Sequence, residues 1–329
     1  MIKNMLVTGS AGFIGANFVR QELANHPDLH IVSVDKLTYA GNIENLSGID
    51  SVRHTFVQGD IVDEKLISDL LSMHHIDTIV HFAAESHVDR SIENPRAFIE
   101  TNIVGTFNLL QCARQHTSLN RFHHISTDEV YGTLDKNAAA FTEQHPYQPN
   151  SPYSASKAGS DHLVRAYAHT YGLPVTISNC SNNYGPYQHR EKLIPTIIHA
   201  CINQKTIPIY GDGSNIRDWI FVIDHCDAIS KIIRDGKVGE TYNVGGECEI
   251  SNLELAKLIT QLMDMYFPDH APHEKLIQFV TDRPGHDWRY AIDNGKISRE
   301  LDWYPGTKLI EGLKKTIEFY IASFQDPVR

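Results

Sequence analysis

The chain has 329 residues, 41% of them hydrophobic and 21% charged, which is the composition of an ordinary globular protein. This length allows a full hydrophobic core and two domains. The net charge of −11 argues against a surface for nucleic acid or anionic membrane, so we expect neither partner.

The first predicted elements are a strand, a glycine-rich turn, a helix and a second strand. Ile2–Val7 is a short apolar strand, and Thr8–Gly15 follows it with glycines spaced G-x-x-G-x-x-G. The second strand, Ile31–Val34, ends on Asp35. This order is typical of a dinucleotide-binding site, because glycines let the backbone approach a pyrophosphate at the helix N-terminus. Asp35 can accept hydrogen bonds from a ribose diol and repels a 2′-phosphate, which favours NAD over NADP.

The alternation of strands and helices continues along the chain. We predict strands at Thr55–Val57 and Thr78–Phe82, with a helix at Glu64–Met73 between them. Asp60 follows the first of these strands, where it can bind an adenine amino group, cap the next helix, or do both. Phe98–Gln115 is predicted to be one long helix with apolar residues on more than one face. This pattern indicates burial against the sheet and against a second subunit.

The stretch from Arg121 to Gly132 joins an apolar strand to a group of polar side chains. Phe122–Ile125 is the predicted strand, and Ser126, Thr127, Asp128 and Glu129 follow it directly. In an open α/β sheet, ligands bind at the carboxyl ends of the strands. Such residues are also common in solvated turns, so this stretch alone leaves both interpretations open.

A helix start at Ser151-Pro152 is followed by Tyr153 and Lys157. The two residues lie four apart and therefore share a helix face. A Tyr-x-x-x-Lys pair is often just an aromatic and a solvated lysine. Downstream of a dinucleotide fingerprint, however, it is typical of a proton-transfer pair. Ionising a tyrosine at neutral pH requires ~4 kcal/mol, and one cation at ~4 Å in a dielectric of ~20 supplies about that amount.

The second half of the chain becomes more polar after the strand Val175–Ile177. We therefore expect an NAD-binding domain over 1–178 and a nucleotide-sugar-binding domain over 179–329. Ile220–Val222 and Thr241–Val244 are predicted strands, and about 218–247 is expected to fold back onto the first domain. Leu253–Met265 and Ile310–Phe324 are predicted amphipathic helices.

Several cations are scattered through this half, next to loop signals. Most are expected to be solvated, but some can converge on a second pyrophosphate, because arginine forks match phosphate oxygens.

The five cysteines are odd in number and lack a C-x-x-C pair, which favours reduced thiols. The start of the chain leaves no room for a signal peptide, and no apolar run approaches ~18 residues. We expect a cytoplasmic protein with no metal site, since the histidines form no ligand cluster.

Together, these stretches resemble the extended short-chain dehydrogenase/reductase family, and within it the nucleotide-sugar 4,6-dehydratases. The resemblance covers essentially the whole chain. It implies an α/β fold, with a Rossmann-type doubly wound parallel sheet and a smaller α/β substrate domain. It also implies bound NAD, a homodimer, and hydro-lyase activity on a nucleotide sugar, with dTDP-glucose as the expected substrate and UDP-glucose as the alternative. The motifs that carry it are Thr8–Gly15, Asp35–Asn42, Ala83–Ser91, Ser126–Gly132, Pro152–Lys157, Asn179–Pro186, Arg217–Trp219 and Thr281–Asp293.

The resemblance also implies roles for individual residues. Thr127 would position a sugar hydroxyl, Tyr153 would act as the base at it, and Lys157 would hold the nicotinamide ribose and lower the tyrosine pKa. Asp128 would be the acid and Glu129 the base of the dehydration. The residues expected to contact NAD are Gly9, Gly12, Phe13, Ile14, Gly15, Asp35, Lys36, Thr38, Asp60, Ile61, Ala83, Ala84, Tyr153 and Lys157. Those expected to contact the nucleotide sugar are Ser86, Thr127, Asn182, Lys192, Arg217, Asn252, Arg283, His286 and Tyr290.

Two other functions are compatible with parts of this pattern. A sugar-nucleotide 4-epimerase needs Tyr153 and Lys157 but has no use for Asp128 and Glu129. A non-enzymatic NAD sensor has no reason to keep either pair. One departure from the family pattern concerns the nucleotide, since His189-Arg190 stands where the family usually has Phe-Pro.

Overall fold

The computed structural model describes residues 2–282 and 284–325. Its centre is a seven-stranded sheet in the order β10-β6-β5-β4-β1-β2-β3, in which all neighbouring strands are parallel. The order reverses between β1 and β4, which makes the carboxyl ends of these strands the place where ligands bind. The strands are β1 (Asn4–Thr8), β2 (His30–Asp35), β3 (His54–Gln58), β4 (Thr78–His81), β5 (Arg121–Thr127), β6 (Val175–Cys180) and β10 (Thr241–Val244).

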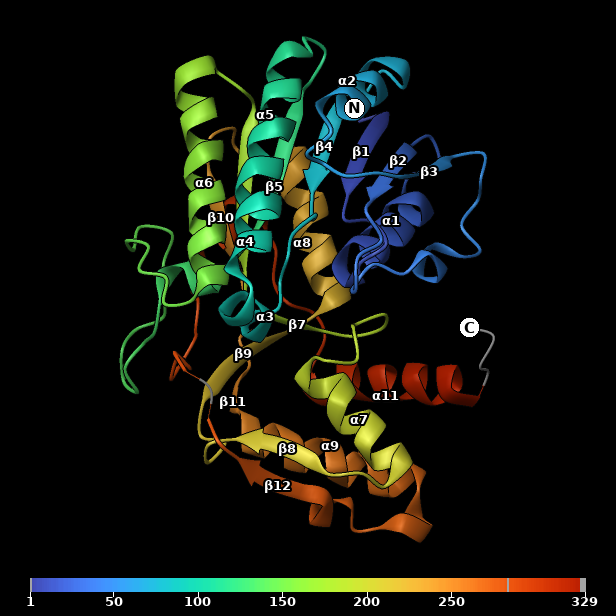
Figure 1. The fold of residues 1–329 in the computed structure, drawn as a ribbon, viewed down its shortest axis with the longest axis vertical. Helices are drawn as coiled ribbons and strands as arrows, with labels where there is room; N and C mark the ends of the chain where they lie inside the picture. The colour runs from blue at the N-terminus through green and yellow to red at the C-terminus, as the bar shows by residue number, and fades with distance from the viewer. Residues whose placement is uncertain (1, 283, 326–329) are drawn as a thin grey trace.

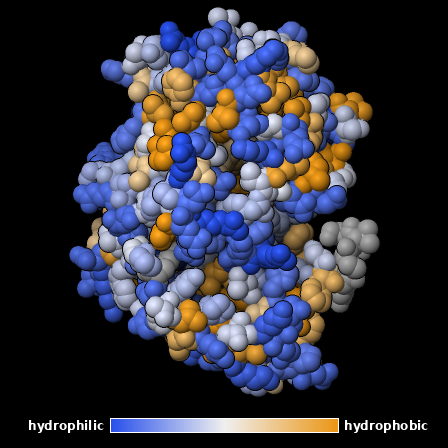
Figure 2. Space-filling model, in the orientation of Figure 1, coloured by the Kyte–Doolittle hydropathy of each residue, from blue (hydrophilic) through white to orange (hydrophobic). Residues whose placement is uncertain are grey.

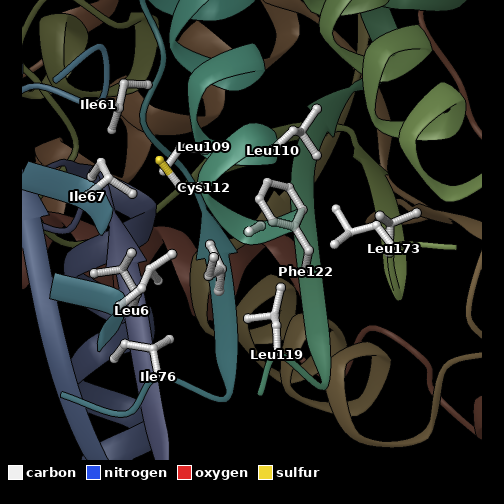
Figure 3. Close-up of a cluster of buried hydrophobic side chains, with 14 of the residues drawn as sticks. Leu6, Ile61, Ile67, Ile76, Leu109, Leu110, Cys112, Leu119, Phe122 and Leu173 are labelled. Carbon is white, nitrogen blue, oxygen red and sulfur yellow. The ribbon is translucent and has the colours of Figure 1, made fainter. Parts of the chain in front are cut away.

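Helices cover both faces of this sheet, so the predicted Rossmann-type doubly wound fold is confirmed (Figure 1). Their apolar sides pack on the strands in two layers. Leu6, Leu110 and Phe122 belong to the layer between the sheet and one set of helices (Figure 3). That set is α2 (Glu64–Met73), α5 (Thr106–Gln115) and α6 (Pro152–Tyr171), and the opposite set is α1 (Phe13–Asn25) and α8 (Val222–Asp235).

A second, smaller lobe lies beyond the carboxyl ends of the strands (Figure 1). It has its own apolar core, to which Ile197, Trp219 and Ile259 belong. Its sheets are β11-β9-β7 and β12-β8. The elements are β7 (Asn182–Tyr184), α7 (Leu193–Asn203), β8 (Ile207–Tyr210), β9 (Ile216–Phe221), β11 (Glu249–Ser251), α9 (Asn252–Tyr266), η4 (Pro268–His270), η5 (His273–Leu276), β12 (Ile277–Val280) and α11 (Leu309–Gln325). A further helix, α10 (Gly295–Leu301), packs on β10 and α8 of the main domain.

The segment expected to fold back onto the first domain is divided between the two lobes. β10 pairs with β6 in the main sheet, and α8 packs beside α1. The strand predicted at Ile220–Val222 belongs elsewhere, because β9 pairs with β7 and β11. Val222 begins α8 instead of ending a strand.

The helix predicted over Phe98–Gln115 is confirmed, but it begins earlier and is not α-helical throughout. α4 (Pro95–Phe98), a π-helix η2 (Ile99–Gly105) and α5 follow one another without a break, and a short helix α3 (Val88–Glu93) precedes them. Within η2, the Asn102 side chain accepts from the Glu85 N–H at 2.8 Å and donates to the Ser156 hydroxyl at 2.8 Å. The wide π turns therefore coincide with a residue that ties this helix to the loop after β4 and to α6.

The predicted start of α6 is confirmed. The Ser151 hydroxyl accepts from the Ser154 N–H at 3.0 Å, and the Ser154 hydroxyl accepts from the Ser151 N–H at 3.0 Å, which is a capping box. Pro152 occupies the first turn, where no N–H is required.

No helix within the described parts of the chain is long and apolar enough to cross a membrane.

Candidate active site

A cavity of about 580 Å³ lies where the carboxyl ends of the main strands meet the smaller lobe. Every residue expected to contact NAD lines it, and so do all five expected catalytic residues. Arg283 lies outside the described residues. The residues expected to contact the nucleotide sugar that line the cavity are Ser86, Thr127, Asn182, Lys192, Arg217, Asn252, His286 and Tyr290.

The glycine turn after β1 forms one end of this cavity. Gly9 has a φ of 70°, and a Cβ there would lie 2.6 Å from the backbone nitrogen of Ala83 at the end of β4. A Cβ on Gly15 would lie 2.3 Å from the Gly9 carbonyl oxygen. Side chains are therefore excluded from the turn, and the N-terminus of α1 opens on the cavity. Its N–H groups and dipole favour an anion such as a pyrophosphate.

Asp35 lies at the end of β2, beside this turn. Its carboxylate accepts from the Ala11 N–H at 2.9 Å and from the Leu37 N–H at 2.8 Å. Burial raises the pKa of Asp35, and these backbone donors oppose the rise. A carboxylate held rigidly at this edge fits a ribose diol, and it disfavours a 2′-phosphate.

Lys36 and Asp60 lie on the same side of the cavity and form an ion pair at 2.6 Å. The interpretation of Asp60 as a helix cap is wrong. Asp63 caps α2 by accepting from the Leu66 N–H at 3.0 Å. The chain makes one more turn before the helix, and there Asp60 accepts from the Val62 N–H at 3.2 Å. Asp60 is therefore left to line the cavity.

The polar residues after β5 form a short 3-10 helix, η3 (Asp128–Tyr131). Thr127 caps it by accepting from the Glu129 N–H at 3.3 Å, and its hydroxyl lies 3.4 Å from Asp128 Oδ1. The turn brings both carboxyl groups to the cavity, although consecutive strand residues point to opposite faces.

Asp128 is buried, whereas Glu129 is only half-buried. Burial first, and then the neighbouring charges of Glu129 and Asp218, raise the pKa of Asp128 well above its ordinary value. Asp128 Oδ2 has no hydrogen-bond partner among residues 2–282 and 284–325. This carboxyl is therefore suited to hold a proton and to donate it into the cavity.

Tyr153 and Lys157 reach the cavity from the first turns of α6. Tyr153 is hydrogen-bonded to Thr127, and the Lys157 ammonium donates to the Ile125 carbonyl at 2.7 Å. Burial, followed by Glu129, raises the pKa of Tyr153 well above its ordinary value. The expectation that Lys157 lowers this pKa is therefore not met by the protein alone.

The cations of the smaller lobe are less free to bind phosphate than their sequence suggested. Arg217 is buried, donates to the carbonyls of Ile216 at 2.7 Å and Asp287 at 3.0 Å, and lies over the Tyr290 ring at 4.4 Å. It nevertheless lines the cavity. Arg289 does not line it, because Glu249 binds its guanidinium through both oxygens.

Sequence reasoning missed a cluster that joins the two lobes over the cavity. The Arg90 guanidinium lies 3.9 Å from the centre of the Tyr39 ring and 2.6 Å from Glu191. The His189 ring packs edge-on against Tyr39 at 5.6 Å. Tyr39 lies in the loop after β2, Arg90 in α3, and His189 and Glu191 in the loop before α7, so sequence spacing gave no signal. The unusual His189 was noticed, but the structure places it beside the loop after β2.

The site has no group of three or more His, Cys, Asp or Glu side chains that could hold a metal ion, as far as the described residues extend. The geometry instead combines a dinucleotide site, a tyrosine–lysine pair and an adjacent acid–base pair. This combination serves hydride transfer together with proton transfer.

Comparisons with known proteins agree with this geometry. A family model described as GDP-mannose 4,6 dehydratase matches residues 6–316. A dTDP-glucose 4,6-dehydratase of Xanthomonas campestris pv. campestris is 52% identical over 97% of this chain and 93% of its own. A solved dTDP-glucose 4,6-dehydratase from Streptomyces venezuelae, with NAD bound, has a TM-score of 0.91 and 46% identity, covering 99% of this chain and 100% of its own.

The fold is shared more widely than these dehydratases. The UDP-glucose 4-epimerase of Thermotoga maritima, solved with UDP-glucose, has a TM-score of 0.88 and 27% identity, covering 98% of this chain and 99% of its own. The two kinds of enzyme therefore differ in side chains more than in architecture. With half of its residues identical to curated dehydratases along nearly its full length, the chain belongs to the dTDP-glucose 4,6-dehydratase family.

Proposed function

We propose that the chain converts dTDP-glucose into dTDP-4-keto-6-deoxyglucose and water, with NAD as its cofactor. The observation that carries this proposal is the pair at the start of η3. Asp128, with its raised pKa, stands next to Glu129 and within reach of Tyr153 through Thr127. A 4-epimerase requires the tyrosine but not this acid–base pair, so the pair favours dehydration.

The order of steps follows from the chemistry of the hexose. The hydrogen on carbon 5 is not acidic until carbon 4 is a ketone. Tyr153 takes the proton of the carbon 4 hydroxyl, which Thr127 positions, while Lys157 holds the nicotinamide ribose. NAD bound there would supply the hydride acceptor for carbon 4 and the hydride donor for carbon 6, so it would not be consumed. Glu129 then removes the carbon 5 proton, and Asp128 protonates the departing carbon 6 hydroxyl.

The protons balance within the site. Glu129 returns its proton to carbon 5 when the hydride arrives at carbon 6. Tyr153 keeps one proton from the carbon 4 hydroxyl, and Asp128 loses one proton to the water. The Thr127 hydroxyl contacts both groups, so it lies on a short path by which the starting state can be restored.

The preference for thymidine over uridine nucleotides rests on a smaller difference. Thymine carries one methyl group more than uracil, and burying it contributes only ~1 kcal/mol, roughly five-fold in affinity. We therefore propose dTDP-glucose as the substrate and UDP-glucose as a poorer one. His189, which packs on Tyr39 in the loop after β2, adds polar bulk where the family usually has phenylalanine and so works to narrow this preference.

We also propose a cytoplasmic homodimer. All five cysteines are free thiols, which fits a reducing compartment. Exposed apolar side chains on η2 and α5 support the dimer, among them Ile99, Val104 and Phe107, which are 46%, 46% and 43% exposed. Figure 2 shows apolar atoms gathered among polar ones on the face that α5 and α6 form.

The function is tested by incubating the purified protein with dTDP-glucose and measuring the alkaline absorbance of a 4-keto-6-deoxy product. We expect this product without added NAD, because a cofactor that is regenerated in place need not leave. Formation of dTDP-galactose would instead identify an epimerase, and the absence of any change would refute both activities. Extraction of the denatured protein should release NAD. A predominance of NADP would contradict the role of Asp35.

A further inference from the structure

The catalytic face of α6 extends one turn beyond Lys157. Tyr153, Lys157 and Asp161 are spaced four residues apart, so their side chains lie along one side of the helix. Asp161 has no exposed surface, and neither the cofactor nor the substrate site includes it. A buried carboxylate is costly unless it is paired, so its neighbours indicate what it does.

Asp161 connects the catalytic helix to the end of the catalytic strand. Its Oδ2 accepts from the Ser126 hydroxyl at 2.7 Å and from the Tyr147 hydroxyl at 3.0 Å. Its Oδ1 lies 3.2 Å from Nε2 of the buried His124. Ser126 precedes Thr127 on β5, so a single carboxylate holds the strand end against the helix that carries the tyrosine and the lysine.

The same histidine leads from Asp161 to the catalytic lysine. Nε2 of His124 lies 3.4 Å from Lys157 Nζ and 3.2 Å from the Ser160 hydroxyl. Lys157 is itself buried, with Ile125 O as its backbone acceptor. The ammonium and the Asp161 carboxylate therefore lie beside the same ring nitrogen, Nε2 of His124.

We propose that Asp161 is a positioning residue which acts through His124 to keep Lys157 cationic in the closed site. The proposal rests on the function proposed above, in which a charged Lys157 supports the ionisation of Tyr153.

The charges in this cluster agree with the contacts. Burial alone would raise the pKa of Asp161, but His124, Lys157 and Ser126 outweigh it and leave that pKa below its ordinary value. Burial lowers the pKa of Lys157, and Asp161 is the first neighbour that opposes the loss of its charge. Burial, followed by Lys157, lowers the pKa of His124 to about 4, so the ring is neutral at pH 7.

Other groups surround the lysine from every neighbouring element. From β4 comes His81, whose pKa burial depresses well below its usual value, so this ring is uncharged. From η3 come Glu129 and Asp128, whose pKa burial and its acidic neighbours raise well above the ordinary value. From β6 comes Cys180, whose pKa burial raises to about 12. Of these, Glu129 is an acid–base group of the reaction itself. Asp161 is thus the fixed counter-charge of Lys157.

The test is the pH profile of kcat/KM for dTDP-glucose in Asp161→Asn. Asparagine keeps a hydrogen-bond acceptor for Ser126 and Tyr147 but removes the charge. Loss of a negative charge lowers the pKa of Lys157, which must stay protonated, and it also lowers the pKa of Tyr153, which must ionise. The acidic limb and the alkaline limb of the pH profile should therefore both move to lower pH. For a buried charge this close to Lys157, we expect a displacement of about one pH unit or more.

Matched variants separate charge from packing. Tyr147→Phe removes one contact of Asp161 and keeps its charge, so its limbs should stay at the wild-type pH. Asp161→Glu should restore the wild-type profile in part. If Asp161→Asn does not fold, Asp161→Ser removes the charge with less bulk and is measured in the same way.

Lower activity with unmoved limbs in the neutral variant would overturn the inference and leave Asp161 a purely structural residue. An equal displacement in Tyr147→Phe would overturn it as well. A wild-type protein that forms no 4-keto product would instead refute the proposed function, so the two failures can be told apart.

Discussion

Asp128 and Glu129 are neighbours in the chain, yet their surroundings suit them to opposite tasks. The carboxyl of Asp128 is enclosed and its pKa is raised by burial and by its acidic neighbours, whereas Glu129 is only half-buried. Differences in environment of this kind are how two carboxyl groups are made into an acid and a base. The assignment can be tested because each role controls a different bond.

Glu129→Gln should separate oxidation from elimination. Oxidation at carbon 4 does not need this residue, so bound NADH should still appear when substrate is added. Exchange of the carbon 5 hydrogen with solvent should fall by ~10²–10⁴, which is the usual cost of losing one acid–base group. Deuterium incorporation followed by mass spectrometry measures it. Exchange at the wild-type rate would exclude Glu129 as the base, and Tyr153→Phe, as the matched control, should suppress NADH formation instead.

Arg217→Ala should weaken binding of dTDP by ~1.5–3 kcal/mol, because a charge-assisted contact to phosphate is lost. The loss should be equal for UDP, since phosphates carry no information about the base. Arg217 also donates to the Ile216 and Asp287 carbonyls, so the alanine variant should melt at a lower temperature. Arg217→Lys keeps the charge but not the fork, and it should bind better than alanine. Calorimetric titration with dTDP and with UDP measures the two affinities. A loss of affinity confined to dTDP would mean that Arg217 contacts the base and not the phosphates.

At the scale of elements, α6 is the part on which the site depends most. Its capping box fixes where the helix begins, and hence where Tyr153 and Lys157 stand. Ser151→Ala removes the acceptor for the Ser154 N–H and should cost ~1 kcal/mol of stability. Ser151→Thr keeps the hydroxyl and should be nearly neutral, as should the exposed Ser72→Ala in α2. Melting temperatures at saturating NAD measure the effect, and an unchanged value for Ser151→Ala would show that the cap contributes nothing.

Local patterns in the sequence predicted α6, the glycine turn and Asp35, because each depends on residues close together in the chain. Asp161 and His124 were not predicted, since their meeting depends on β5 packing against α6. The sequence of the π segment that carries Asn102 predicts an ordinary helix, and the sequence of β9 predicts a buried strand without indicating the sheet to which it belongs. Tertiary contacts determine the π geometry and the strand partners, and apolar periodicity carries no information about such contacts.

At the scale of the whole molecule, the site is completed only where the two lobes meet. The main sheet supplies Thr127 and Asp35, and the smaller lobe supplies Lys192, whose ammonium donates to the Ser86 carbonyl at 3.1 Å. An ion pair of 2.6 Å between Arg90 and Glu191 joins the two lobes beside the cavity.

The last prediction concerns assembly. α5 and α6 stand side by side on one edge of the molecule (Figure 1), and η2, which leads into α5, packs so closely on α6 that a Cβ on Gly159 would lie 3.1 Å from Ile103. Their outer surface exposes Val104, Phe107 and Tyr171, the last 48% exposed. Pairing these helices with those of a second copy would form a four-helix interface, and a stable one buries ~800 Å² per partner.

Sedimentation velocity at micromolar concentration should therefore show a dimer. Phe107→Glu places a charge in the centre of the proposed interface and should shift the protein towards monomer. Met265→Glu is the matched control, because Met265 is also exposed, at 71%, but lies on α9 in the smaller lobe. A wild-type protein that sediments only as a monomer would refute the interface, and so would a Phe107→Glu variant that dimerises as well as the wild type.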